Sequence, residues 1–240
     1  MPAALHRVGG SGSPVVLIHG FGSDRLGWVA NSPALMEAHT VWAVELPAHG
    51  TALPGETTPA EMALAVADVL PQTDEKIALI GHSLGGAVAA HLAADHPDRI
   101  GKVALIAPAG YGGGMPDRAF LEAFSTLEDE ESALALLQRL VVRKRLILPQ
   151  MAQYVLAHLN KPGIREALAA VATEVASFEP APLPAASLVV WGADDEINPL
   201  DQGRLSGLEP EALVLPDTGH LPHVEAATKV NRTTLAYLAD

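Results

Sequence analysis

Residues 77–97 read IALIGHSLGGAVAAHLAADHP. The segment begins as an apolar run typical of a buried β-strand, reverses in a glycine-rich hexapeptide, and continues as an alanine-rich stretch that ends at Pro97. At the reversal, Ser83 completes a Gly-x-Ser-x-Gly pattern with Gly81 and Gly85. Between a strand and a helix, this pattern is typical of a nucleophile elbow. The stretch therefore predicts an α/β fold and raises the question of what would activate the hydroxyl.

The geometry of such an elbow would give the serine a chemical role. A sharp turn from strand to helix strains the backbone of Ser83 and projects its hydroxyl outward, while glycines at 81 and 85 allow a close approach. The first N–H groups of the following helix have no partner within it, so Leu84 N–H can donate to a developing oxyanion. The alternative is a plain glycine-rich turn in which Ser83 caps the helix.

Seven short apolar runs alternate with stretches of helical periodicity along the chain. This alternation is typical of a mostly parallel sheet covered by helices, so we expect an α/β fold with about seven strands flanked by helices. The runs occupy residues 3–9, 14–20, 40–46, 76–82, 102–109, 187–192 and 211–217, and helices are expected over 58–70, 84–96 and 222–238.

One interval between these runs is too long for a single crossover, because more than seventy residues separate the fifth run from the sixth. Glycines and prolines lie at both borders of the interval, and its interior has amphipathic helical stretches. We expect a helical cap over residues 111–184, inserted into a core formed by residues 1–110 and 185–240. A second, independent domain is the alternative.

The charge of the chain argues against polyanionic partners. Its 28 acidic and 15 basic residues give a formal net charge of −13, so we expect no binding of nucleic acid. Hydrophobic residues make up 49% of the chain, which is enough for one sizeable core. The N-terminal decapeptide MPAALHRVGG lacks the basic and apolar regions of a signal peptide, and we expect no membrane association.

The chain contains no cysteine, which excludes disulfides, thiolate catalysis and cysteine-ligated metals. This composition fits a reducing compartment, so we expect a cytoplasmic protein. Among its ten histidines, His220 and His223 form the closest pair, but no His-Glu-x-x-His motif supports a metal, and we expect neither metal nor cofactor. We interpret His82 as a wall beside the serine, and His19 and His49 as supports of the site.

A nucleophilic serine needs a base, and the base needs an orienting acid. The loop after the sixth run carries Asp194 and Asp195, and the loop after the seventh carries His220. Both loops follow the carboxyl ends of expected parallel strands, where the sites of α/β proteins form. The order serine, aspartate, histidine matches one hydrolase fold, but the residues alone do not choose between the aspartates. Phe21, between two glycines after the second run, offers a second oxyanion N–H.

Taken together, these motifs resemble those of α/β-hydrolase-fold serine hydrolases over nearly the whole chain. Within that superfamily the chain is most similar to the C-terminal hydrolase-like domain of acetoin-dehydrogenase E2-type (dihydrolipoamide acetyltransferase-like) proteins. Such proteins carry a lipoyl domain ahead of this one, whereas about fourteen residues precede the VVLIHG strand here, so we expect no acyl-carrying arm. The resemblance rests on the stretches HGFGSDRLGW, VELPAHG, GHSLGGAVAAHLA, LIAPAGYG and GHLPHVEAATKVN.

The resemblance also bears on individual positions. The family's acidic loop reads Gly-x-x-Asp-x-x-x-Pro, and residues 192–199 fit it with Asp195 as the acid. We expect Asn198 to cap a helix that follows, and the other aspartate to bind backbone amides. In the loop that the family usually writes Asp-Leu-Pro-Gly-His-Gly-x-Ser, this chain has Glu45, Ala48 and Thr51, which we interpret as variation of the scaffold.

The function expected from these residues is cleavage of a small carboxylic ester or thioester through an acyl-enzyme on Ser83. His220 would be the base and Asp195 its orienting acid, and the N–H groups of Phe21 and Leu84 would form the oxyanion hole. The expected partner is therefore a small acyl substrate, whose identity, like the oligomeric state, the sequence leaves open. Two alternatives remain, namely an acyltransferase with the same triad and a non-catalytic accessory domain.

Overall fold

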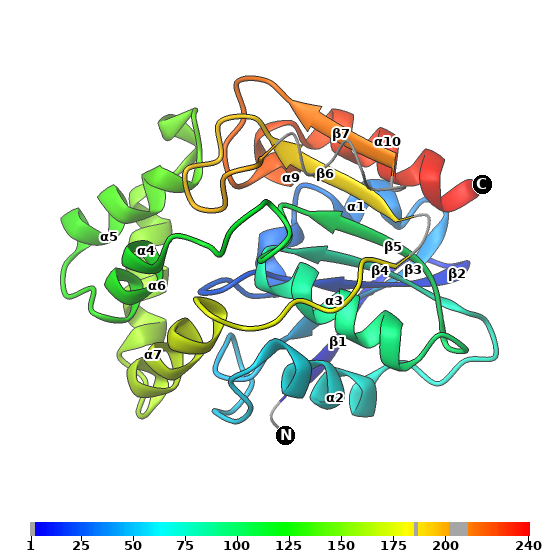
Figure 1. The fold of residues 1–240 in the computed structure, drawn as a ribbon, viewed down its shortest axis with the longest axis horizontal. Coiled ribbons are helices and arrows are strands. Elements are labelled where there is room, and N and C mark those ends of the chain that lie inside the picture. The colour runs from blue at the N-terminus through cyan, green and yellow to red at the C-terminus, as the bar shows by residue number, and fades with distance from the viewer. Residues whose placement is uncertain (1–2, 185–186, 202–210) are drawn as a thin grey trace.

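The computed structural model describes residues 3–184, 187–201 and 211–240. Its centre is a seven-stranded sheet in the order β1-β3-β2-β4-β5-β6-β7, in which β1 is antiparallel to β3 and every other pair is parallel (Figure 1). The mostly parallel α/β sheet expected from the sequence is confirmed. The strands are β1 Ala4–Gly9, β2 Ser13–Ile18, β3 His39–Glu45, β4 Ile77–His82, β5 Ile100–Ile106, β6 Leu188–Gly192 and β7 Glu211–Leu215.

Both faces of the sheet are apolar because both are covered by helices. Along β2, Val16 and Ile18 join the hydrophobic cluster beneath α2 (Pro59–Val69) and α3 (Leu84–Asp95). Val15 and Leu17 point to the other face and join the cluster that includes residues of α1 (Ser32–Leu35) and α10 (Ala227–Ala239). The alternation follows from the two-residue period of a strand, and it explains the continuous apolar runs in the sequence.

Local sequence signals account for the ends of α2 and α3. Thr58 caps α2 in a reciprocal capping box with Glu61, and Pro59 occupies the first turn, where its missing N–H costs no hydrogen bond. Helix α3 starts directly after Ser83 and ends at Asp95, two residues before Pro97. Its alanines at 87, 89 and 90 are fully buried, so the helix lies close to the sheet.

The C-terminal helix expected over 222–238 is divided in the structure. A short helix α9 (Pro222–Glu225) is separated from α10 by Ala226, whose backbone angles of φ −119° and ψ 35° lie outside the helical region. The prediction of one continuous helix was therefore wrong. Periodicity did not reveal the break, because it occurs where the Glu225 side chain binds backbone groups of two other segments, as described below.

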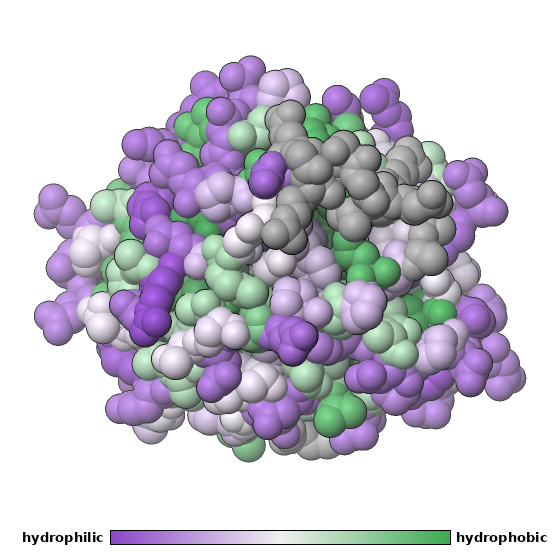
Figure 2. Space-filling view, in the orientation of Figure 1, coloured by the Kyte–Doolittle hydropathy of each residue, from purple (hydrophilic) through white to green (hydrophobic). Residues whose placement is uncertain are grey.

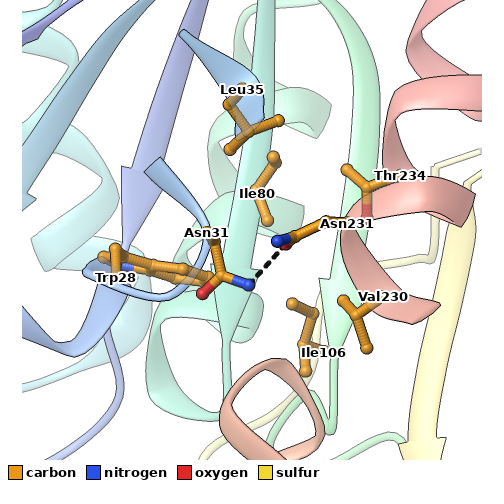
Figure 3. A pocket seen from close by; sticks show the side chains of 8 residues that line it. All are labelled: Trp28, Asn31, Leu35, Ile80, Ile106, Val230, Asn231 and Thr234. Atoms are coloured by element: carbon orange, nitrogen blue, oxygen red, sulfur yellow. Dashed lines mark hydrogen bonds between the residues drawn. The ribbon is translucent and has the colours of Figure 1, made fainter. Parts of the chain in front are cut away.

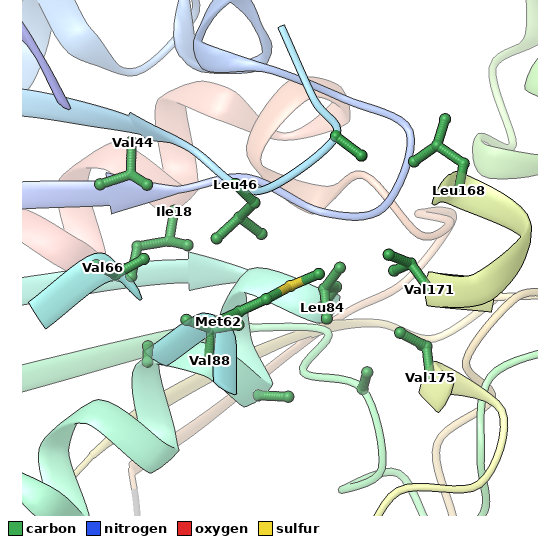
Figure 4. Packing of buried hydrophobic residues seen from close by; sticks show 14 of the residues in the cluster. Ile18, Val44, Leu46, Met62, Val66, Leu84, Val88, Leu168, Val171 and Val175 are labelled. Carbon is green, nitrogen blue, oxygen red and sulfur yellow. The ribbon is translucent and has the colours of Figure 1, made fainter. Parts of the chain in front are cut away.

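Between β5 and β6 lie the helices α4 (Arg118–Ser125), α5 (Glu130–Leu137), α6 (Pro149–Leu159) and α7 (Ile164–Val175), with the short 3-10 helices η2 (Gln138–Leu140) and η3 (Lys144–Leu146). We refer to α4–α7 as the inserted helices. Figure 1 shows them beyond the carboxyl ends of the strands. Their buried residues belong to the same hydrophobic cluster as α2 and α3, and Figure 4 shows Val171 and Val175 of α7 beside Leu84. The expected core boundary at residue 185 falls outside the described residues.

On the face in Figure 2, hydrophilic side chains predominate and hydrophobic ones form small groups between them. Within the described residues, no helix has both the length and the apolar character needed to cross a membrane.

Candidate active site

Ser83 stands at the junction of β4 and α3 with φ 52° and ψ −117°, a left-handed conformation that is strained for any residue with a Cβ. A Cβ on Gly81 would lie 2.3 Å from the Gly85 carbonyl oxygen, and one on Gly85 would lie 2.2 Å from that of Ile18. Both glycines are therefore required by close packing of backbone on backbone. Among the described residues Ser83 makes no side-chain capping bond to α3, so its hydroxyl is not used as a helix cap.

The imidazole of His220 is fixed by a buried carboxylate. His220 Nδ1 donates to Asp195 Oδ2 over 2.7 Å, and the other oxygen, Oδ1, accepts from the backbone N–H groups of Ile197 and Asn198 at 2.9 Å each. The Asp195 side chain is fully buried, whereas Asp194 is exposed. The expectation that the other aspartate would bind backbone amides was wrong, because Asp195 accepts both those amides and the histidine.

Asn198 also differs from its expected role as a helix cap. Residues 199–201 have no regular secondary structure, and residues 202–210 lie outside the described part of the chain. The Asn198 side-chain amide instead donates to the carbonyl oxygens of Ala107 and Pro108, at 3.1 and 2.8 Å. It thereby ties the Asp195 loop to the end of β5.

Ser83, His220 and Phe21 line one cavity of about 510 Å³ at the carboxyl ends of the strands. His82 forms part of its wall, as expected, and donates from Nε2 to the backbone oxygen of His220 over 2.8 Å. Burial, reinforced by the neighbouring His223 and His220, holds the pKa of His82 well below its ordinary value. His82 is therefore a neutral donor that holds the His220 loop against the elbow.

The loop after β2 lies directly against the elbow. A Cβ on Gly20 would come within 2.7 Å of His82 Nδ1 and 3.1 Å of Ser83 Cβ, so only glycine permits this approach. Phe21 follows, and its ring meets that of Phe124 from α4 at a centroid distance of 5.4 Å. Leu84 is the first residue of α3, where helical N–H groups have no partner within the helix. The two expected oxyanion donors thus come from neighbouring segments.

Two buried histidines support this loop, as interpreted from the sequence. His19 Nε2 accepts from Leu46 N–H at 3.1 Å, and His49 Nε2 accepts from Gly22 N–H at 2.9 Å. In each ring Nδ1 is then the donor, to the carbonyl oxygen of Gly20 or Pro47. Burial lowers the pKa of both rings, so both are neutral acceptors.

Glu45, which replaces the family's usual aspartate, keeps its loop hydrogen-bonded. Its buried carboxylate accepts from the backbone N–H and hydroxyl of Thr51, and Arg25 donates to it over 2.6 Å. Burial alone would raise the pKa of Glu45, but these hydrogen bonds lower it to about 2. Ala48, where the family has glycine, adopts φ 66°.

Comparison with known proteins agrees with this geometry. The model of the Alpha/beta hydrolase family matches residues 15–233. The chain belongs to this family. It is 35% identical over 242 residues to the dihydrolipoyllysine-residue acetyltransferase component of the acetoin cleaving system of Pseudomonas putida, and the match covers 96% of this chain but 64% of that protein. The corresponding component from Cupriavidus necator is 34% identical over an alignment of 237 residues that covers 94% of this chain and 63% of the relative. The chain therefore spans less than two thirds of the length of these relatives.

Hydrolases are also among its relatives and structural neighbours. A 2-hydroxy-6-oxononadienedioate/2-hydroxy-6-oxononatrienedioate hydrolase of Comamonas testosteroni is 29% identical over 255 residues, covering 96% of this chain and 89% of that one. The meta-cleavage product hydrolase CumD of Pseudomonas fluorescens superposes with a TM-score of 0.84 at 23% identity, covering 99% of this chain and 94% of CumD. An esterase from Exiguobacterium antarcticum gives 0.83 at 15% identity, with 99% and 96% coverage. The structural likenesses establish the fold. The resemblance expected from the sequence, to α/β-hydrolase-fold proteins and among them to acetoin-dehydrogenase E2-type proteins, is confirmed.

Glu225 is a residue of the site that sequence reasoning missed. Its fully buried carboxylate accepts from Gly219 N–H at 2.6 Å, directly before His220. It also accepts from the N–H groups of Arg143 and Val142, at 2.9 and 3.2 Å. One side chain therefore joins the histidine loop to the segment between η2 and η3. The available signal was an acidic residue in a short, otherwise uncharged segment after His220.

A small cavity of about 10 Å³ lies on the other face of the sheet, between β4, β5 and α10 (Figure 3). Its volume corresponds to about one water molecule. Trp28 Nε1 and Asn31 Oδ1 line this region and have no protein partner among the described residues. The amide of Asn31 donates to the backbone oxygen of His223 and to Asn231 Oδ1, which fixes α9 and α10 to the segment after η1 (Arg25–Trp28).

The buried His223 packs between two aromatic rings, at 4.8 Å from Trp28 and 4.6 Å from His82. Burial and the neighbouring His220 lower the pKa of His223 to about 3, so it is neutral near pH 7. In the part of the chain that the structure describes, no group of three His, Asp or Glu side chains is arranged to hold a metal ion.

Proposed function

We propose that this protein is a serine hydrolase that cleaves a carboxylic ester or thioester through an acyl-enzyme on Ser83. One observation carries the proposal. A strained serine lines the same cavity as a histidine whose Nδ1 is held by a buried aspartate. Backbone strain at a buried turn costs about 1–3 kcal/mol, and it persists where function requires the conformation. A non-catalytic accessory domain would have no use for it.

In the proposed mechanism, Ser83 Oγ attacks the substrate carbonyl while His220 Nε2 accepts the hydroxyl proton. Asp195 holds the proton on Nδ1, so that Nε2 is free to act as base, and it stabilises the imidazolium that forms. The N–H groups of Phe21 and Leu84 stabilise the oxyanion. His220 then protonates the leaving group, and water, activated by the same ring, releases the acid and restores Ser83.

We further propose that residues 111–184 act as a cap that shapes the acyl pocket. Apolar or aromatic residues of this segment line the cavity, among them Phe120, Phe124, Leu137, Met151 and Tyr154. Most of the lining is apolar, and a volume of about 510 Å³ lies in the range typical of drug-sized ligands. These features favour a substrate with an apolar acyl group longer than acetyl.

The test combines labelling with turnover. A fluorophosphonate probe should modify the protein once, at Ser83, and p-nitrophenyl esters of graded chain length should be hydrolysed, best at intermediate lengths. Ser83→Ala is the matched control and should abolish both signals, because only the activated hydroxyl reacts. Failure of the probe to label a folded protein, or labelling that persists in Ser83→Ala, contradicts the proposal.

An acyltransferase with the same triad is the second candidate. It is favoured by the 35% identity to a protein named as an acetyltransferase component, although the chain spans only part of that relative. The two reactions share the acyl-enzyme and differ in its acceptor. Adding a dithiol such as dihydrolipoamide during ester turnover distinguishes them. A transferase gives a saturable increase in acyl-thiol product with less free acid, whereas a hydrolase gives free acid at an unchanged rate.

A further inference from the structure

The main cavity contains a buried carboxylate that the proposed mechanism does not use. Asp24 lines the cavity on the loop after β2, and the residue as a whole is 5% exposed. Its Oδ1 accepts from Leu26 N–H at 2.7 Å, which caps η1, and its Oδ2 accepts from the hydroxyl of Tyr154. Tyr154 lies on α6, 130 residues away in sequence, so one hydrogen bond connects the cap to the loop that carries Phe21.

Among the described residues that line the cavity, no lysine or arginine balances this carboxylate, although Arg25, the next residue in the chain, attracts it electrostatically from outside the lining. Three arginines near the lining segments pair with other carboxylates: Arg25 is bonded to Glu45 and Arg139 to Asp117, and Arg143 lies 3.6 Å from Glu225. Burial lowers the pKa of the lining histidines 19, 82 and 223, so these rings add no positive charge near pH 7.

Most of the remaining lining is apolar out to the protein surface, with Ser23 and Gln150 among its polar members. The described chain exposes nine large hydrophobic side chains, and five of them line this cavity, namely Leu26, Val29, Leu148, Met151 and Tyr154. An apolar chain can therefore stay in contact with apolar side chains from the opening to the interior. A negatively charged substrate group would lose its hydration there and face a like charge.

We propose that Asp24, held in place by Tyr154, makes the cavity select substrates with uncharged apolar acyl groups and reject acyl groups that carry a carboxylate. This inference rests on the proposed ester or thioester hydrolysis, and it names the substrate class. The physical basis is repulsion across a poorly hydrated cavity, where charges interact more strongly than in water. Tyr154 acts by position, because its hydroxyl directs Oδ2 without carrying charge itself.

The test compares three p-nitrophenyl esters of similar size. The butyrate and the methyl-capped succinate are neutral, whereas the free hemisuccinate carries a terminal carboxylate. For the wild type, kcat/KM should be at least thirtyfold higher for the neutral succinate than for the hemisuccinate. Asp24→Asn keeps an oxygen for Leu26 N–H and should reduce this ratio at least tenfold. Tyr154→Phe removes the hydroxyl that directs Oδ2 but keeps the charge, so the ratio should fall, but by less than in Asp24→Asn.

A binding measurement separates this inference from the proposed chemistry. In the Ser83→Ala background, calorimetric titration should show that Asp24→Asn increases the affinity for octanoate at least threefold and leaves that for octanamide unchanged. The role of Asp24 is overturned if the wild type prefers the neutral succinate over the hemisuccinate by less than threefold in kcat/KM. It is also overturned if Asp24→Asn changes neither this preference nor the affinity for octanoate. If no ester is hydrolysed and Ser83 is not labelled, the proposed function fails, and the titration alone decides the selectivity.

Discussion

Exchange of Asp195 for asparagine tests the proposed triad most directly, because the structure determines which way the new amide must face. Asp195 Oδ1 accepts two backbone N–H groups and Oδ2 accepts His220 Nδ1–H. An asparagine satisfies the two backbone donors only with its oxygen at the Oδ1 position. Its NH2 group then faces His220 and requires Nδ1 to be an acceptor. The ring proton moves to Nε2, which can no longer take the proton of Ser83.

The expected magnitude follows from this tautomer. In serine-protease triads the same exchange lowers kcat by about 10⁴-fold, which corresponds to about 5.5 kcal/mol on the barrier. The fold should survive, because the backbone hydrogen bonds remain and the exchanged charge-assisted bond is worth roughly 1.5–3 kcal/mol. Asp194→Asn is the matched control. Its side chain is exposed, so we expect a change in stability within about 0.5 kcal/mol and kcat near that of the wild type.

The assay measures kcat with the best p-nitrophenyl ester, the rate of fluorophosphonate labelling and the thermal midpoint for both variants. Loss of turnover and labelling in a folded Asp195→Asn protein supports the triad. If Asp195→Asn retains more than about a tenth of the wild-type kcat, Asp195 is not the orienting acid, since even a partial tautomer effect exceeds this. If Asp194→Asn is the inactive variant, the assignment is wrong by one residue.

Three further predictions concern other parts of the site. The two carboxylate oxygens of Glu225 accept from three backbone N–H groups, and Glu225→Gln replaces one of these oxygens by an NH2 group. The exchange should lower the unfolding free energy by about 1–3 kcal/mol and reduce kcat. Glu128→Gln, at an exposed position, is the control and should change neither quantity. Denaturant titrations at several pH values should show the unfolding free energy falling as the pH drops below 6.5, because the pKa of His223 is about 3 in the folded state and unfolding therefore takes up a proton. His223→Phe should make the slope of unfolding free energy against pH shallower by up to about 1.4 kcal/mol per pH unit. An unchanged slope would contradict the lowered pKa of His223. Both Ser83→Gly and Ser83→Ala should be inactive, but the glycine variant should be more stable by about 1 kcal/mol, since it relieves the strain at φ 52°; equal thermal midpoints would argue against strain.

Much of the fold was predictable because the decisive signals are local. The seven apolar runs and the Gly-x-Ser-x-Gly stretch each lie within a few residues, and each predicted the element found there. The division of the last helix was not predictable in this way. Glu225, the last residue before the break, contacts a segment of the chain more than eighty residues away, and such a contact leaves no trace in the helical period.

The site, too, was only partly predictable from the sequence. Ser83, His220 and the acidic loop could be located because the carboxyl ends of parallel strands converge at one edge of a sheet. The choice between Asp194 and Asp195 could not be made from the residues alone, since adjacent loop positions differ only in where the backbone directs each side chain. The structure brings Asp195 to His220 and gives it the two amides that were expected for its neighbour.

The hydrogen bonds between the inserted segment and the loops of the site were the feature least predictable from the sequence. Tyr154 bonds to Asp24 and Glu225 bonds to the backbone of residues 142 and 143, so the cap is tied to the loop that carries Phe21 on one side and to the loop that carries His220 on the other. In both cases a buried carboxylate is satisfied by donors from a distant segment, and loss of either partner leaves a polar group unsatisfied in an apolar surrounding. Position of the cap and geometry of the site are therefore coupled through two carboxylates. Tyr154→Phe and Glu225→Gln should therefore each increase amide hydrogen exchange in α6 or in residues 142–143 and also alter ester turnover, whereas substitutions on the exposed face of α5 should do neither.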